Sequence, residues 1–228
     1  LTPGLFVLFD RVIVPRFEEE EAREADAIEE TSDIIVAGHG RWGGIVNRML
    51  LDCGYRTTVL DHSSKQLDML RNIGFRVFFG DATRPDLLKA AGIDHARLLI
   101  VAMDDKERNT ELVRYVIKTY PHVHVIARAI DRHHVYDLWA AGCRDIIRET
   151  FDSGVRAGRS ALEALGMSHD RAEERAGAFV ADDRAGMLEL APLWDPEIPW
   201  LENTRYVERA RQLVSERDSR LIETETKD

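Results

Sequence analysis

Apolar residues between positions 33 and 148 alternate between short runs and longer segments with helical spacing. The run at 34–37 is rich in β-branched side chains and ends at Gly38, and the segment 41–51 then repeats apolar residues at intervals of three or four. Strands are predicted at 33–37, 55–60, 75–79, 97–102, 123–128 and 145–148, with intervening helices at 41–51, 63–73, 85–92, 106–119 and 133–141. This alternation predicts an α/β fold with a doubly wound, parallel, six-stranded sheet of Rossmann type.

The strand pattern stops near Thr150. The remaining sequence predicts helices at 151–165, 170–189 and 206–220, with a break that is rich in proline between the last two. We therefore expect a nucleotide-binding domain at 32–149 and a C-terminal helical extension at 150–228.

The first 31 residues differ from the rest in composition. Residues 1–30 hold nine acidic residues and three arginines, and an apolar run broken by charges precedes the acidic stretch. Because the chain begins with Leu rather than Met, residues 1–17 are interpreted as the end of a truncated transmembrane helix and 18–31 as an acidic linker. The alternative is an N-terminal helix that covers an apolar patch of the same domain.

Charge narrows the classes of partner. The chain of 228 residues has a formal net charge of −10. Such acidity gives no general attraction to nucleic acid, although a local basic pocket can still bind a phosphate. We expect no nucleic-acid partner.

A glycine-rich motif, Gly38-His39-Gly40-Arg41-Trp42-Gly43, lies between the first predicted strand and helix. In that position the first glycine permits a tight turn, the second lets a pyrophosphate approach, and the third allows close helix–strand packing. The helix N-terminus supplies N–H groups for the phosphates, and Arg41 is a further candidate contact. The alternatives are a plain strand-to-helix turn and a solvated Arg41.

Acidic residues follow the neighbouring strands. Asp61 lies 23 residues after Gly38, where a carboxylate binds the ribose hydroxyls of an adenine nucleotide, so AMP or NAD(H) is favoured over NADP. Asp81 is read either as lining the base or as capping the next helix, and Met103-Asp104-Asp105 reaches the same crevice with helix capping as the favoured role of its aspartates. The predicted cofactor-binding residues are Gly38, His39, Gly40, Arg41, Trp42, Gly43, Asp61, His62, Asp81, Ala82 and Met103.

No catalytic constellation accompanies this motif. The sequence has no GxSxG motif, no metal-ligand spacing and no nucleophile with an obvious base. The chain is therefore predicted not to be an enzyme and to hold no metal. A free-standing NAD-dependent oxidoreductase remains the alternative.

The segments 34–43, 59–62, 77–83 and 126–129 resemble the regulatory nucleotide-binding domains of potassium transport proteins, the regulator of potassium conductance class, which includes the Trk-type domains. The segment 148–151 (RETF), with Gly158-Arg159 and 161–166, is more narrowly similar to the Kef-type glutathione-regulated potassium/proton antiporters. The resemblance implies a domain at the cytoplasmic face of the inner membrane that gates cation efflux. Its implied partners are a transmembrane antiporter domain, a second copy of the chain, glutathione and an ancillary flavin oxidoreductase subunit.

The resemblance also implies a glutathione site. Arg48 and Arg148 match the contacting arginines of that family, whereas Asp183 stands where the family has an asparagine. A carboxylate there repels glutathione, so glutathione is expected to bind weakly. The residues alone leave a solvated Arg48 and an ion pair of Arg148 with Glu149 or Asp152 open.

The predicted helix after the sheet has a single apolar stripe. Phe151, Val155, Leu162 and Leu165 share one face. We expect this stripe to form a homodimer contact, whereas in an oxidoreductase the helix would carry a substrate domain.

Overall fold

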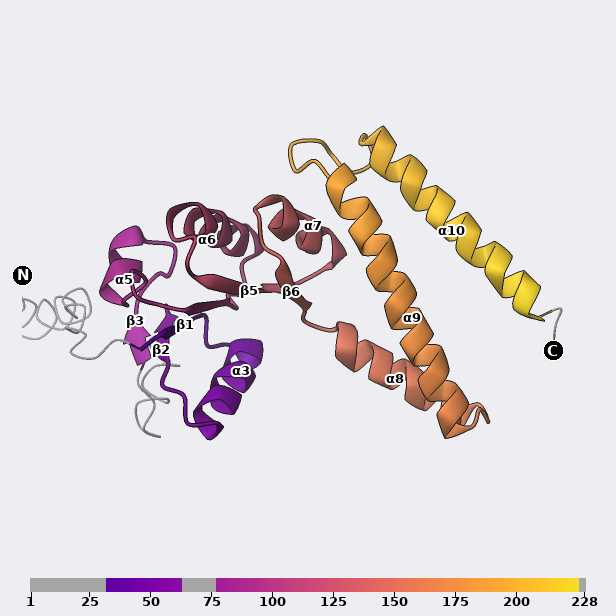
Figure 1. Cartoon of the computed structure of the whole chain (residues 1–228), viewed down its shortest axis with the longest axis horizontal. Coiled ribbons are helices and arrows are strands. Elements are labelled where there is room, and N and C mark those ends of the chain that lie inside the picture. The colour runs from indigo at the N-terminus through magenta and orange to yellow at the C-terminus, as the bar shows by residue number, and fades with distance from the viewer. Residues whose placement is uncertain (1–31, 63–76, 226–228) are drawn as a thin grey trace, which may run out of the picture.

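The computed structural model describes residues 32–62 and 77–225 (Figure 1). The expected transmembrane end at 1–17, the linker at 18–31 and the helix at 63–73 lie outside the described residues. Within the described ranges, no helix is both long enough and apolar enough to cross a bilayer.

Parallel strands form one sheet in the order β3-β2-β1-β4-β5-β6. The strands are β1 (Ile34–Ala37), β2 (Thr58–Asp61), β3 (Val77–Phe79), β4 (Leu98–Val101), β5 (His124–Ala129) and β6 (Asp145–Arg148). Every adjacent pair is parallel, with Ile34–Ala37 in register with Leu98–Val101 at the centre. The chain order reverses between β1 and β4, which is the switch point where α/β proteins bind ligands. The predicted α/β class and parallel sheet are confirmed.

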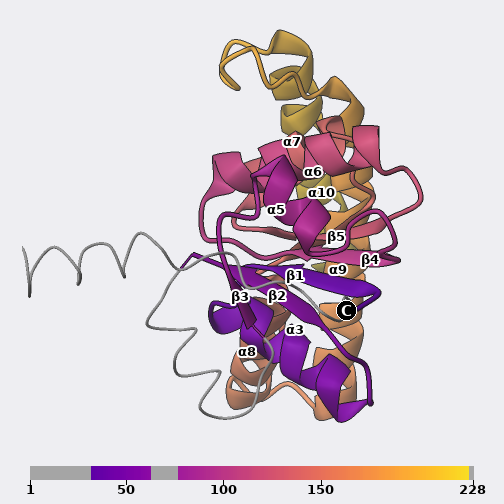
Figure 2. The same cartoon turned by 90° about the vertical axis from the view of Figure 1, so that its left-hand side faces the viewer.

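Helices cover both faces of the sheet (Figure 2). They are α3 (Arg41–Asp52), α5 (Pro85–Ala90), α6 (Lys106–Thr119) and α7 (Arg132–Ala140). Alternate residues of β1 point to opposite faces of the sheet. Ile35 and Ala37 belong to a large core with α5, α6 and α7, whereas Ile34 and Val36 belong to a smaller core with α3. Continuous burial of strands on both faces is the reason for their unbroken apolar runs.

The C-terminal residues form α8 (Phe151–Ala164), α9 (His169–Leu190), a short 3₁₀ turn η2 (Ala191–Leu193) and α10 (Thr204–Glu225). α8 and α9 pack as a hairpin that extends away from the sheet (Figure 1). The end of α9 is anchored by an aromatic core in which Tyr136 of α7 contacts Trp194 and Tyr206. α10 begins two residues earlier than predicted and continues five residues further.

Several other predicted boundaries differ from the structure by one to three residues. The predicted strand at 55–60 begins only at Thr58, because Gly54 has a positive φ of 83° and Tyr55 is exposed after it. The predicted helix at 151–165 ends at Ala164, and Leu165, the residue that follows it, is 85% exposed.

Candidate functional site

The glycine loop brings the carboxyl ends of β1 and β4 together. Gly38 has φ 95°, and a Cβ at this residue would lie 2.7 Å from the backbone N of Met103. A Cβ on Gly43 would lie 2.1 Å from the carbonyl oxygen of Gly38. Both positions therefore require glycine, one for the turn and one for the contact between α3 and β1.

The N-terminus of α3 faces this loop without a side-chain cap. Gly40 precedes the helix and makes no side-chain hydrogen bond, and the first turn contains no acidic residue. A Cβ on Gly40 would meet only the Asp104 carboxylate, at 3.8 Å. The first N–H groups of α3 and its positive dipole end suit a phosphate, and Arg41, the exposed first residue of α3, lies beside them.

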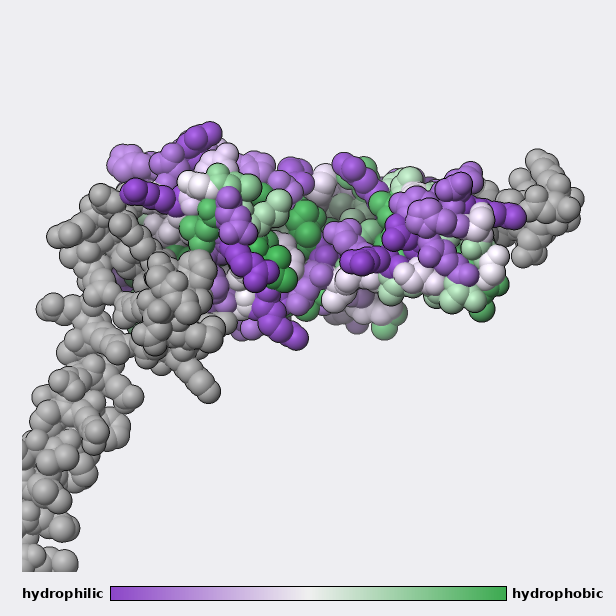
Figure 3. Space-filling model, turned by 90° about the horizontal axis from the view of Figure 1, so that it is seen from below, coloured by the Kyte–Doolittle hydropathy of each residue, from purple (hydrophilic) through white to green (hydrophobic). Residues whose placement is uncertain are grey.

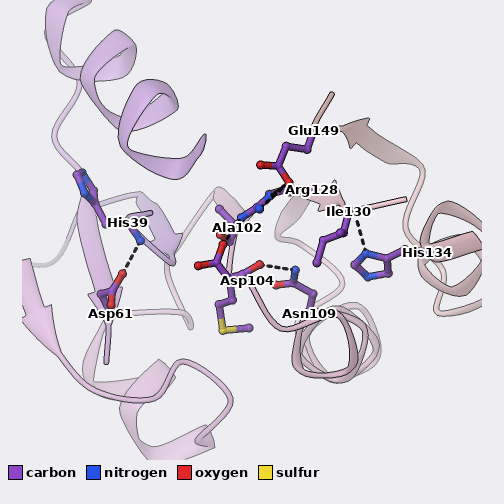
Figure 4. A network of polar contacts seen from close by, with 10 residues as sticks. His39, Asp61, Ala102, Asp104, Asn109, Arg128, Ile130, His134 and Glu149 are labelled. Carbon is purple, nitrogen blue, oxygen red and sulfur yellow. Dashed lines mark hydrogen bonds and ion pairs between the residues drawn. The ribbon is translucent and has the colours of Figure 1, made fainter. Parts of the chain in front are cut away.

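Asp61 ends β2 beside the loop, as predicted for a ribose-binding carboxylate. Its side chain is 7% exposed, and its Oδ2 accepts a hydrogen bond from the backbone N–H of His39 at 2.7 Å (Figure 4). His62 is exposed, with its Nδ1 4.0 Å from Asp61 Oδ1. The bond from His39 fixes the carboxylate at the edge of the loop.

The His39 ring lies under α3, against Asn47 and Gly44 of that helix. Its Nε2 lies 3.1 Å from Asn47 Nδ2, and Thr57 donates to Asn47 Oδ1 at 2.5 Å. Burial lowers the pKa of His39 below its ordinary value. Trp42 likewise packs into the core under α3. The motif therefore predicts the backbone of this loop better than the roles of these two side chains.

Asp81 holds the loop after β3. Its Oδ1 accepts bonds from the backbone N–H and the hydroxyl of Thr83, and its Oδ2 pairs with Arg108 of α6. Burial opposes ionisation, but the Thr83 bonds and the Arg108 charge outweigh it and lower the pKa of Asp81. Asp81 does not cap α5, whose N-cap is Arg84. Ala82 and Met103 are buried nearby in the main core.

A buried arginine that the sequence interpretation missed lies at the other side of the switch point. Arg128, near the end of β5, is 4% exposed and bonds Ala102 O, Asp104 and Glu149 (Figure 4). The signal was a charged residue inside the otherwise apolar run at 125–129. Of the two aspartates after β4, only Asp105 caps α6, by accepting the N–H of Arg108 at 2.9 Å.

Of the three residues of the expected glutathione site, the structure brings Arg148 and Asp183 into contact. Arg48 is exposed on α3. Asp183 of α9 pairs with Arg148 at the end of β6 and with Arg132 of α7, in the latter case at 2.8 Å. The sequence left an ion pair of Arg148 with Glu149 or Asp152 open as an alternative. In the structure Glu149 instead pairs with Arg128, and Arg148 pairs with Asp183 of α9.

The described residues also bear on metal binding. Within 32–62 and 77–225, no group of three or more His, Cys, Asp or Glu side chains is arranged to bind a metal.

A model of the TrkA-N domain family matches residues 34–149. The chain belongs to this family. A second model, for the C-terminal domain of the potassium efflux system KefB, matches residues 153–228. The TrkA-N domain is thus followed here by a Kef-type segment, which confirms the expected Kef-type regulatory domain.

Individual relatives agree with this assignment. The glutathione-regulated potassium-efflux system protein KefC of Escherichia coli is 45% identical over 179 residues, which is 78% of this chain and 28% of KefC. The Kef CTD of Shewanella denitrificans, solved in an AMP-bound form, is 44% identical with a TM-score of 0.66, and the match covers 71% of this chain and 99% of that chain. The TrkA-N domain of the Escherichia coli inner membrane protein ybaL shares the fold, at 23% identity and a TM-score of 0.52 over 60% of this chain and 98% of that domain.

Proposed function

We propose that this chain is the nucleotide-sensing regulatory part of a potassium efflux protein and that it binds an adenine nucleotide, AMP or NAD(H). The observation that carries the proposal is the uncapped N-terminus of α3 beside the buried Asp61 carboxylate. The 44% identity of this chain to a Kef CTD that was solved in an AMP-bound form supports the same ligand class.

Each part of the nucleotide has a candidate partner. The N–H groups of α3 and the Arg41 guanidinium suit the phosphate. Asp61 suits the ribose hydroxyls, and it disfavours a 2′-phosphate by repulsion. Asp81, Ala82 and Met103 lie at the carboxyl ends of the neighbouring strands, where an adenine ring would extend.

Calorimetric titration tests the nucleotide proposal. We expect AMP and NADH to bind more tightly than NADPH, and Asp61→Asn to weaken AMP binding by about tenfold or more, because hydrogen bonds to a charged group contribute about 1.5–3 kcal/mol. Asp52→Asn, at the exposed C-terminal end of α3, makes the same chemical change as a control. Equal affinity for NADPH, or equal effects of the two substitutions, would contradict the ribose assignment.

We propose the remaining partners from the similarity to KefC. The chain spans 28% of the length of KefC, so we place it as the part of a longer protein that follows a transmembrane antiporter domain, at the cytoplasmic face of the membrane. Residues 1–17 would then be the end of a membrane helix and 18–31 the linker. An ancillary flavin oxidoreductase subunit belongs to the same proposal.

We also propose a homodimer through α8. No residue of α8 is buried, although Phe151 stacks on Phe179 of α9. On the same side of the molecule as α3, hydrophobic groups lie at the surface among hydrophilic ones (Figure 3); α3 itself exposes Ile45 and Met49. Changing Leu162 and Leu165 to Asp should give monomers in sedimentation, whereas Val214→Asp on α10 should leave the assembly unchanged. A double variant that stays dimeric would place the interface elsewhere.

A further inference from the structure

The first turn of α6 is bonded to the loops that follow both β3 and β4. Its Arg108 pairs with Asp81 in the loop after β3. Its Asn109 is fully buried and donates a hydrogen bond from Nδ2 to Met103 O, in the loop after β4, at 2.8 Å. Asp81 and Met103 are two of the residues proposed to lie beside the adenine ring. A ligand in the crevice therefore meets two loops that are held by one turn of helix.

The same turn of α6 also reaches α7. Lys106 Nζ lies 3.4 Å from Asp137 Oδ2 and 3.7 Å from Asp131 Oδ2. The Asp137 side chain is only 18% exposed, and its other oxygen, Oδ1, accepts a hydrogen bond from Trp194 Nε1 at 2.9 Å. Hydrogen bonds to an ionised group are stronger than neutral ones. One carboxylate on α7 thus joins the start of α6 to the residues that follow α9.

Trp194 holds the C-terminal segment, defined as residues 191–216, against α7. Its ring contacts Tyr136 of α7 and Tyr206 of α10, with centroids 5.4 Å and 5.3 Å away. Asn203 connects the segment internally: its Nδ2 donates to Leu193 O at 2.8 Å, and its Oδ1 accepts the N–H of Tyr206 at 3.2 Å. The bond from Trp194 to Asp137 therefore bears on the placement of the segment as a whole.

We propose that a nucleotide in the crevice stabilises the docking of the C-terminal segment on α7, and that Lys106, Asp137 and Trp194 transmit this effect. The inference rests on the proposed nucleotide site and adds a regulated element to it. A ligand that orders the loops of Asp81 and Met103 also restricts the turn of α6 that carries Lys106, so the next contacts lose less conformational entropy when they form. Coupling between two sites is reciprocal, so a docked segment raises the affinity for the nucleotide by the same factor.

Hydrogen exchange of the whole chain, with and without saturating AMP, tests the coupling. We expect AMP to slow exchange in residues 191–216 by about fivefold or more, the lower end of ordinary coupling between two sites. Trp194→Phe keeps an aromatic ring but loses the N–H, and Lys106→Met keeps an apolar stem but loses the charge. Both variants should abolish this slowing. Their affinity for AMP in calorimetric titration should fall by a similar factor, because the coupling is reciprocal.

Two control variants make the same chemical changes elsewhere. Trp200→Phe alters an exposed indole that also stacks on His133, and Lys118→Met alters an exposed residue in the last turn of α6. Both should keep the slowing by AMP. Each variant is compared with itself in the presence and absence of AMP, so a general loss of stability does not imitate a loss of coupling.

The outcomes separate this inference from the broader proposal. If wild type binds AMP but exchange in residues 191–216 does not slow, the coupling is overturned while nucleotide binding stands. The roles of Lys106 and Trp194 are overturned if the slowing persists in their variants, or if it disappears equally in the two controls. If calorimetry shows no binding of AMP to wild type, the proposed function fails and this inference fails with it.

Discussion

The sheet and the α8–α9 hairpin are stabilised in different ways. At the centre of the sheet, Ile35, Val36 and Leu99 are fully buried, and burial of each such side chain contributes about 1.5–3 kcal/mol. α8 has no buried residue, and the contacts that join its hairpin to the sheet domain include the ion pairs of Asp183 with Arg148 and Arg132. The sheet is therefore determined by its own packing, whereas the hairpin is held to the sheet domain by the aromatic core at the end of α9 and by these ion pairs.

The largest difference is expected from the same substitution made in both regions. Gly43→Ala should destabilise the fold by about 2–3 kcal/mol or more, because its Cβ would lie 2.1 Å from Gly38 O, and α3 must move away from β1 to accept it. Gly158→Ala on α8 meets nothing within 4 Å and should stabilise by about 0.5–1 kcal/mol through helix propensity. Thermal unfolding of both variants measures the contrast.

Nucleotide binding gives a second measurement on the same two variants. Gly43→Ala should also abolish AMP binding, since the loop and the start of α3 no longer keep their geometry, and Gly158→Ala should not affect it. Similar melting temperatures for the two variants would contradict the tight packing inferred at Gly43.

A smaller effect is expected from the contact that joins the two regions. Asp183 is 9% exposed on its side chain and faces two arginines, so Asp183→Ala leaves two like charges unpaired and should cost about 1–3 kcal/mol, less than a fully buried pair because Arg132 is 43% exposed. Hydrogen exchange should rise in α8 and α9 while the sheet stays protected. Glu189→Ala, which removes an exposed pair with Arg209 at the other end of α9, is the matched control.

The same contact bears on glutathione. If Arg148 holds a glutathione carboxylate, Asp183 competes for it, and Asp183→Asn should improve binding by about fivefold to thirtyfold. Arg148→Ala should remove any binding that is present. Tight binding to wild type that does not respond to Asp183→Asn would place Asp183 outside the glutathione site.

The two regions also differ in how far the sequence predicts them. The apolar runs and the GxGxxG spacing predict the strands and the turn at Gly38 because burial and backbone geometry leave few alternatives there. The pairing of Arg148 with Asp183 joins residues 35 positions apart and depends on the angle at which α9 returns, which no local pattern encodes. The contacts of Arg128 could not be predicted for a related reason. They require Asp104 and Glu149, which come together only when three strands end side by side.

The smallest expected effect is a pH dependence confined to the sheet half. Burial lowers the pKa of His39 in the folded state, so the unfolded chain binds a proton more readily. The stability from neutral His39 is thus fully present above the ordinary pKa of 6.5 and is lost as pH falls below it, through the lowered folded-state pKa.

His39→Gln, which keeps an acceptor for Asn47, should flatten the loss of stability between pH 7 and 5, by at most about 1.4 kcal/mol per pH unit for one proton. Buried His134, whose pKa is also lowered by burial, should retain its own share of the pH dependence. His169→Gln in the hairpin, where the ring is exposed beside Glu163, is the control. Urea unfolding at a series of pH values measures all three proteins, and an unchanged slope in His39→Gln would contradict the assignment of this pH dependence to the ring under α3.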